Sequence, residues 1–166
     1  MEGSESEFRM LALAIFATGG RLIETGNGLV APLGLTSAWW QVLGALRYAP
    51  EPLPTASIAR TMGLTRQAVQ RSVDLLADRG LVEFRPNPHH RRAKLVVLTA
   101  AGLDAVRRAE EAAAPIDRAM AARIGSARIH SAIATLEEIG AILSEERQGP
   151  RRPSLDRPPS GKGQDQ

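Results

Sequence analysis

The sequence predicts a mainly helical chain that carries one small β-hairpin, and three observations support this fold class. Apolar residues recur at helical spacing over most of the chain. Two short β-prone runs, 81–85 and 94–98, flank a loop that contains proline. Before them, two short helical patterns meet at Gly63. The order of helix, turn, helix and hairpin over 55–99 predicts a winged helix-turn-helix, which is a DNA-reading layout.

The helix-turn-helix is predicted from capping and turn residues. Thr55 is expected to cap the first helix, because its hydroxyl can accept a bond from a first-turn N–H. Ala59 provides a small residue where the helices cross, and Gly63 tolerates a positive φ at the turn. Thr65 is expected to cap the second helix and Gly80 to end it.

The second helix has one apolar and one polar side. Val69, Val73 and Leu76 recur at helical spacing and are expected to face inward. Arginine can bond guanine O6 and N7 together, and glutamine can do the same for adenine N6 and N7. A solvated helix face is the alternative interpretation. The residues predicted to read bases are Arg66, Gln67, Gln70 and Arg71, and the capping residue Thr65 is also predicted to contact DNA.

The hairpin has a basic tip. Pro86 and Pro88 interrupt the two β-prone runs, since proline cannot donate to a sheet ladder. A thin basic loop beside a recognition helix can reach a minor groove, where narrow DNA attracts arginine. A charged loop that only aids solubility is the alternative. The predicted DNA-contacting residues of this wing are Arg91, Arg92 and Lys94.

The segment 36–99 resembles the MarR family of bacterial transcriptional regulators, and a weaker resemblance extends over about residues 8 to 145. The residues that carry it include Trp40, Leu43, Leu46, Ile58-Ala59, Leu64-Thr65, Leu75-x-x-Arg79-Gly80-Leu81-Val82 and Arg92-x5-Leu98-Thr99. The resemblance implies that Arg92 enters the minor groove. The family usually has aspartate at the position of His90, and that aspartate helps to hold the arginine. The wing is therefore expected to be positioned differently or to respond to pH, because histidine titrates near neutrality.

Helices are expected on both sides of the reading head. Residues 1–7 are expected to be disordered, and a helix over 8–23 is expected to end at Gly26-Asn27-Gly28. A second helix is expected from Thr36, as its cap, to about residue 48.

The chain after the hairpin is also helical in pattern. Thr99 is expected to cap a helix over 100–123, and Pro115 should kink it or break it in two. The last helix, 127–146, has an apolar stripe that no intrachain sheet covers. The resemblance implies that the first and last helices of two subunits interlock, which gives a homodimer.

These expectations define the domain organisation. A MarR-like domain spans 8–146, with dimerisation helices at 8–50 and 99–146, a winged helix-turn-helix head at 53–98 and a disordered basic tail at 147–166. Charge is polarised along the chain: residues 51–94 hold eight basic and four acidic side chains, net +4, whereas the whole chain is only +3. A localised basic head is what phosphate attraction requires.

Other function classes find little support. The chain has no cysteine, no nucleotide-binding glycine loop and no catalytic constellation, so no cofactor, metal or enzyme activity is predicted. Its first residues are acidic, unlike a secretory signal, and no apolar run approaches a membrane span. A cytoplasmic protein is the simplest interpretation.

The predicted function is a homodimeric regulator, most simply a repressor, on a pseudo-palindromic double-stranded DNA operator. By analogy with the family, a small aromatic or phenolic ligand is expected in a cleft near Trp39, Arg47 and the start of the helix over 100–123, although the favoured interpretation of Trp39 by itself is a core or interface residue. Two alternatives stay open: a winged helix used for protein interaction or dimerisation without DNA, and a small-molecule-binding protein on the same dimer scaffold.

Overall fold

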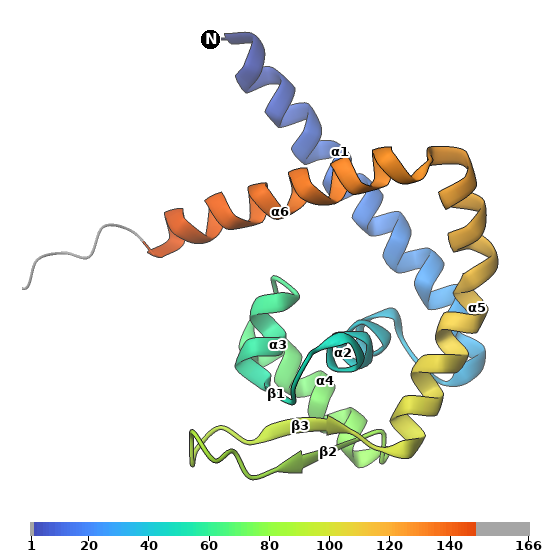
Figure 1. Cartoon of the computed structure of the whole chain (residues 1–166), viewed down its shortest axis with the longest axis vertical. Helices are drawn as coiled ribbons and strands as arrows, with labels where there is room; N and C mark the ends of the chain where they lie inside the picture. The colour runs from blue at the N-terminus through green and yellow to red at the C-terminus, as the bar shows by residue number, and fades with distance from the viewer. Residues whose placement is uncertain (1, 149–166) are drawn as a thin grey trace, which may run out of the picture. The chain divides into compact units, whose positions relative to one another are not determined.

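A computed structural model of the chain describes residues 2–148 (Figure 1). The chain forms two compact units, one up to Arg118 and one from Ala119. The elements before the hairpin are α1 (Glu2–Val30), η1 (Ala31–Leu33), α2 (Ser37–Tyr48), β1 (Leu53–Pro54), α3 (Thr55–Thr61) and α4 (Arg66–Asp78). The hairpin and the final helices are β2 (Val82–Arg85), β3 (Leu95–Leu98), α5 (Ala100–Ile124) and α6 (Ser126–Gln148). The mainly helical fold class with a small wing is confirmed.

The core of the first unit lies among α2, α3, α4, the sheet and the first turns of α5. The fully buried side chains of this core include Leu43, Ile58, Val73, Leu76, Val96 and Val106. Ala59 is only 4% exposed at the crossing of α3 and α4, and Gly63 has a φ of +64° in the turn between them. Both predictions for the helix-turn-helix are therefore confirmed.

The sheet has three antiparallel strands in the order β1-β3-β2. Within the hairpin, Val82 pairs with Leu98 and Arg85 with Leu95, as the two β-prone runs predicted. The short strand β1 was not predicted, because it is two residues long and contains Pro54. Proline is tolerated there because β1 is an edge strand.

The cap predicted for α3 is wrong. The helix begins at Thr55 itself, with Pro54 in the cap position, and no side chain caps it. Pairing in β1 holds Pro54 extended at the edge of the sheet, so the first helical turn follows immediately. Thr55 is 7% exposed and packs into the protein instead of capping.

The expected limits of the first helix are also wrong. Helix α1 already includes residues 2–7, which we expected to be disordered, and it continues through Gly26 and Asn27 to Val30. A Cβ on Gly26 would lie 2.9 Å from Oγ of Ser37, so this glycine allows α1 and α2 to approach closely. Asn27 Oδ1 accepts a hydrogen bond of 2.7 Å from the Ser37 N–H. These residues join two helices and do not end the first.

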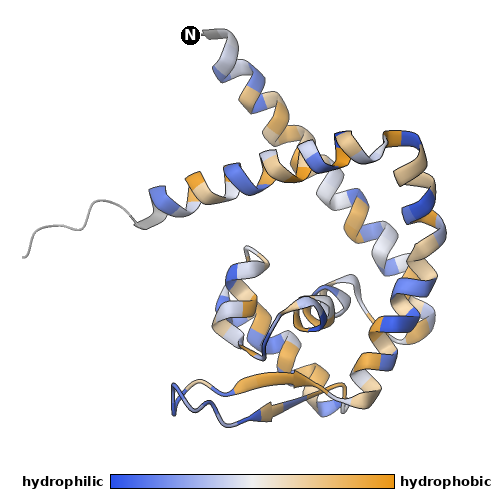
Figure 2. Cartoon of the chain, in the orientation of Figure 1, coloured by the Kyte–Doolittle hydropathy of each residue, from blue (hydrophilic) through white to orange (hydrophobic). Residues whose placement is uncertain are grey.

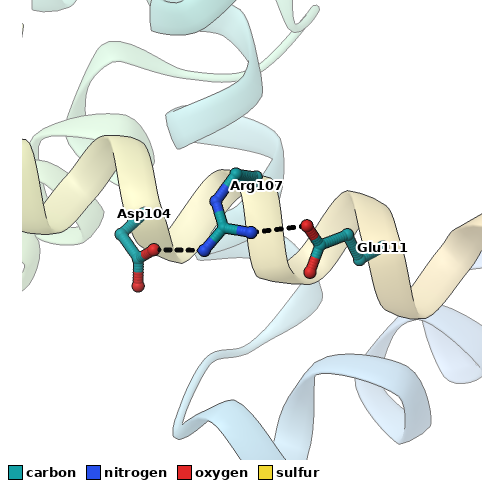
Figure 3. Close-up of polar contacts among 3 residues, drawn as sticks. All are labelled: Asp104, Arg107 and Glu111. Carbon is teal, nitrogen blue, oxygen red and sulfur yellow. Dashed lines mark hydrogen bonds and ion pairs between the residues drawn. The ribbon is translucent and has the colours of Figure 1, made fainter.

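Helix α5 begins as predicted and passes Pro115 as a single helix. Thr99 accepts a 3.0 Å bond from the Gly102 N–H, which confirms the cap. Of the two outcomes expected at Pro115, the break does not occur, and the kink stays a prediction. Before the proline, Arg107 donates to Asp104 at 2.6 Å and to Glu111 at 2.5 Å (Figure 3). The hydrogen bond to Asp104, helped by the charge of Glu111, raises the pKa of Arg107. Such pairs at i,i+3 and i,i+4 favour the helix in the turns before the proline, where the Glu111 carbonyl cannot accept a bond from residue 115.

Parts of α1 and α6 are orange in Figure 2, which marks apolar residues, and large apolar side chains of both helices are exposed. On α6 these are Ile133, Leu136, Ile142 and Leu143, and on α1 they include Leu13 and Phe16, which are 69% and 77% exposed. Among the described helices, none is by itself long and apolar enough to cross a membrane, although the bent pair Gly3–Leu33 and Ser37–Tyr48, at 86°, has enough length and apolar content together.

Candidate nucleic-acid interface

Helix α4 is held firmly at both ends. Thr65 caps it by accepting a 3.2 Å bond from the Ala68 N–H, as predicted. Gly80, with a φ of +70°, ends it. Val69, Val73 and Leu76 are at most 1% exposed, so the opposite face of the helix is turned to solvent. A rigid helix with a free polar face is the geometry that a major-groove reader needs.

That polar face forms one wall of a groove of about 630 Å³ between α3, α4 and the wing. Arg66 and Gln70 line it from α4, and Arg92 and Lys94 line it from the chain that leads into β3. The structure thus brings four of the predicted residues together on one basic surface. The remaining ones, which do not line this groove, are exposed: Thr65, Gln67, Arg71 and Arg91.

Three further residues of the groove were missed by the sequence reasoning. Arg60 projects from the last turn of α3, where only its charge distinguished it. Phe84 lies in β2 with its ring 5.8 Å from Nζ of Lys94, a cation–π contact that restrains the lysine. Asp74 accepts a 2.8 Å bond from Nε2 of Gln70, and the spacing of four residues on one helix was the available signal.

The tip of the wing is held by hydrogen bonds that its backbone N–H groups donate. Asn87 Oδ1 accepts from the His89 N–H at 2.9 Å, and the carbonyl of His90 accepts from the Ala93 N–H at 3.0 Å. Within the part of the chain that the structure describes, Arg92 has no salt bridge, and His90 lines the groove beside it. Arg92 is also exposed, so its guanidinium can contact a ligand.

The residues predicted to bind a small molecule already have partners. The guanidinium of Arg79 stacks on the Trp39 ring at 4.4 Å and donates to the Gly34 carbonyl at 3.0 Å. This contact links the end of α4 to the connector before α2. Arg47 forms a salt bridge of 3.2 Å with Glu110 of α5 and lines a separate cleft of about 270 Å³ with Leu103. Trp39 is not among the residues that line this cleft, so the structure does not bring the two predicted ligand residues into one site.

Tyr48 completes the contact between α2 and α5. Its hydroxyl donates a 2.5 Å bond to the same Oε1 of Glu110 that Arg47 contacts. This bond favours the neutral phenol, so the hydrogen bond to Glu110 raises the pKa of Tyr48 above 10.0, against a lowering effect of Arg47. The stabilisation from this shift is therefore present below pH 10 and is lost as the pH rises through the folded-state pKa.

Tyr48 is the single tyrosine of the chain, so absorbance at alkaline pH reports its ionisation alone. In the wild type we expect a midpoint above 10. In Glu110→Ala the raising effects of Glu110 are lost, while the lowering effect of Arg47 and the raising effect of burial remain, so we expect a lower midpoint than in the wild type. Glu111→Ala, which removes the neighbouring carboxylate, serves as the control and should titrate like the wild type. Equal midpoints in wild type and Glu110→Ala would contradict the contact.

The capped helix α4, the three-stranded sheet with its basic loop and the groove between them are the features of a winged-helix DNA-binding protein. The sequence model of the MarR family matches residues 33–93. An uncharacterized protein of Mycobacterium tuberculosis is 33% identical over 141 residues, which cover 85% of this chain and 97% of that protein. The chain belongs to the MarR family of transcriptional regulators.

Solved structures agree with this assignment. A MarR-family regulator from Rhodococcus sp. RHA1 shares 25% identity and a TM-score of 0.65 over 80% of this chain and 94% of its own. CouR from Rhodococcus jostii RHA1, solved with p-coumaroyl-CoA, shares 27% identity and a TM-score of 0.64 over 78% and 91%. The repressor CouR bound to a 23-mer DNA duplex shares 29% identity and a TM-score of 0.65 over the same shares.

Proposed function

We propose that this chain is a homodimeric, sequence-specific DNA-binding repressor that recognises a pseudo-palindromic operator. The observation that carries the proposal is the groove in which Arg66 and Gln70 of α4 face Arg92 and Lys94 of the wing. In the proposed complex α4 enters a major groove, and the wing reaches the neighbouring minor groove. The 23-mer DNA duplex bound by CouR supports this mode of use for the same fold.

The dimer in this proposal is supported by the apolar surface of α1 and α6. Leu13 and Phe16 on α1 and Leu136 and Leu143 on α6 are each at least 48% exposed in the single chain. Large apolar side chains exposed on a helix in this way mark an interaction site in a water-exposed protein. A second copy of the chain offers the matching surface, and it supplies the second head that a palindrome requires.

Release by a small aromatic ligand is also part of the proposal, with a revised site. The ring of Trp39 is covered by Arg79, so a better candidate is a mainly apolar cleft of about 490 Å³ between α1 and α2. Trp40, Leu22 and Ile23 line this cleft, and Gly19 and Gly44 leave it open. Its size is in the range of small-molecule sites. The p-coumaroyl-CoA bound to CouR supports an aromatic ligand.

The test of DNA recognition is the selection of bound duplexes from a random pool at about 100 mM salt, a condition under which phosphate attraction alone is weakened. Enrichment of a palindrome with half-sites about one helical turn apart is the expected result. If no sequence is enriched, the proposal is contradicted. A protein-interaction module whose surface is only electrostatically basic would then be favoured.

Arg92→Ala should weaken binding to the selected duplex by about tenfold, because each head loses one minor-groove or phosphate contact. The slope of log affinity against log salt should become shallower by roughly one for each lost contact. Fluorescence anisotropy at several salt concentrations measures both. The matched control is Arg107→Ala, which removes an exposed arginine of α5 that is already paired with two carboxylates. Equal affinities of the two variants would remove Arg92 from the interface.

A further inference from the structure

The groove contains one acidic side chain among the described residues that line it. Asp74 lies on α4 one turn after Gln70, and the other charged lining residues are Arg60, Arg66, Arg92 and Lys94. A carboxylate at such a place repels phosphate and weakens attraction to every DNA sequence. Its presence is therefore unexplained by charge and points to a role in choosing among bases.

Asp74 has one specific partner. Its Oδ1 accepts a hydrogen bond of 2.8 Å from Nε2 of Gln70, and it has no salt bridge within the described part of the chain. An ionised carboxylate can only accept hydrogen bonds. The atom of the Gln70 amide that faces it must therefore be the nitrogen, which fixes the orientation of an amide that could otherwise be flipped.

This bond changes what Gln70 can offer to a base. A free glutamine amide has two N–H donors and one carbonyl acceptor. Guanine presents two acceptors in the major groove, N7 and O6, so a free amide can satisfy it with both donors. Adenine presents one acceptor, N7, and one donor, N6. With one N–H committed to Asp74, Gln70 retains one donor and one acceptor, which fits adenine and leaves a guanine acceptor without a partner.

We propose that Asp74 is a specificity-determining residue that acts through Gln70 and makes α4 read adenine and reject guanine at one position of each half-site. The inference rests on the proposed DNA-binding function. Asp74 is a positioning residue, since its effect on the base passes through the Gln70 amide.

The test repeats the selection with variants at positions 70 and 74. In the wild type, the position that loses its preference in Gln70→Ala should favour adenine over guanine. In Asp74→Ala the second N–H is released, and the adenine-to-guanine ratio there should fall by about tenfold, in the range of one bidentate base contact. Asp74→Asn keeps an oxygen acceptor without the charge and should keep most of the preference.

Two controls separate this effect from a change in charge or in folding. Asp78→Ala removes the same charge from an exposed position at the end of α4 that does not line the groove. It should raise affinity for all duplexes and leave the ratio unchanged. Asp74→Ala in a Gln70→Ala background should have no effect on the ratio. Circular dichroism melts of each variant confirm that the exposed substitutions leave the fold intact.

The outcomes distinguish the inference from the function on which it rests. If no duplex enriches with the wild type, both fail. If a palindrome enriches but Asp74→Ala leaves the adenine-to-guanine ratio unchanged, or the wild type prefers guanine at that position, only the role of Asp74 is overturned. The same holds if Asp74→Asn loses the preference as fully as Asp74→Ala, because charge would then be the cause.

Discussion

Gly102→Ala should lower the free energy of unfolding by about 3 kcal/mol or more, the upper part of the range for overpacked sites. A Cβ at this position in α5 would lie 1.9 Å from the carbonyl oxygen of Leu81 and 3.2 Å from Cδ2 of Leu98. The carbonyl cannot simply move away, because it accepts a 3.1 Å hydrogen bond from the Thr99 N–H. Either α5 or the start of the wing must shift, so the substitution strains the junction between α5 and the head.

Thermal unfolding measures this loss, with a midpoint expected to fall by about 6–12 °C for a chain of this length. The matched control is Gly44→Ala, a helical glycine of α2 whose Cβ would meet no atom within 4 Å. It should be neutral or stabilise the protein by up to about 1 kcal/mol. Both variants are compared at one protein concentration, since a dimer's midpoint depends on it. A Gly102→Ala protein as stable as Gly44→Ala would mean that the approach of Leu81 to α5 is not as close as described.

Leu136→Glu should convert the proposed dimer to a monomer and reduce affinity for the selected duplex by about 100-fold or more. Leu136 is 48% exposed, and Ile133 and Leu143 lie on the same side of α6 at helical spacing. A buried glutamate in an apolar interface without a partner is strongly unfavourable. Separate heads then bind their half-sites without the effective concentration that linkage provides, which is worth a factor of 10² to 10⁴.

Light scattering with size-exclusion chromatography gives the mass, and anisotropy gives the affinity. Ala134→Glu adds the same charge two residues away, on the opposite side of the helix, and should leave both values unchanged. If the wild type is itself monomeric, or if Leu136→Glu remains a dimer with full affinity, α6 is not the dimerisation surface.

Local signals predicted much of the fold. Capping by Thr36, Thr65 and Thr99 was read from hydroxyl residues at helix starts and is present, with Trp39, Ala68 and Gly102 as the donors. The buried face of α4 could also be predicted from neighbouring residues, because its buried side chains recur at helical spacing. Such features depend on residues close in sequence, which is why a single sequence reveals them.

The predictions were wrong where contacts between residues far apart in the sequence determine the local structure. Gly26-Asn27-Gly28 has the composition of a helix end, but Ser37 of the next helix approaches Gly26 and bonds to Asn27. Trp39 was offered as a ligand residue by analogy with the family, but Arg79, forty residues later, stacks on its ring. The strand β1 exists because β3 offers it an edge. No local pattern specifies these contacts.

The candidate site shows the same division. Arg66, Gln70, Arg92 and Lys94 were predicted from residue type and position and do line one groove. Their use in DNA reading stays a prediction. Arg60 was missed because the path of α3 toward the wing cannot be seen in sequence, and Asp74 because an acidic residue is not sought in a DNA-binding surface.

Hydroxyl-radical footprinting of the wild-type protein on the selected duplex tests the central claim most directly. We expect two protected patches about one helical turn apart, related by the symmetry of the operator, with further protection in the flanking minor grooves. In Arg92→Ala the flanking protection should fade while the central patches persist. A single patch, or protection spread evenly along the duplex, would contradict a dimeric reader that uses α4 and the wing.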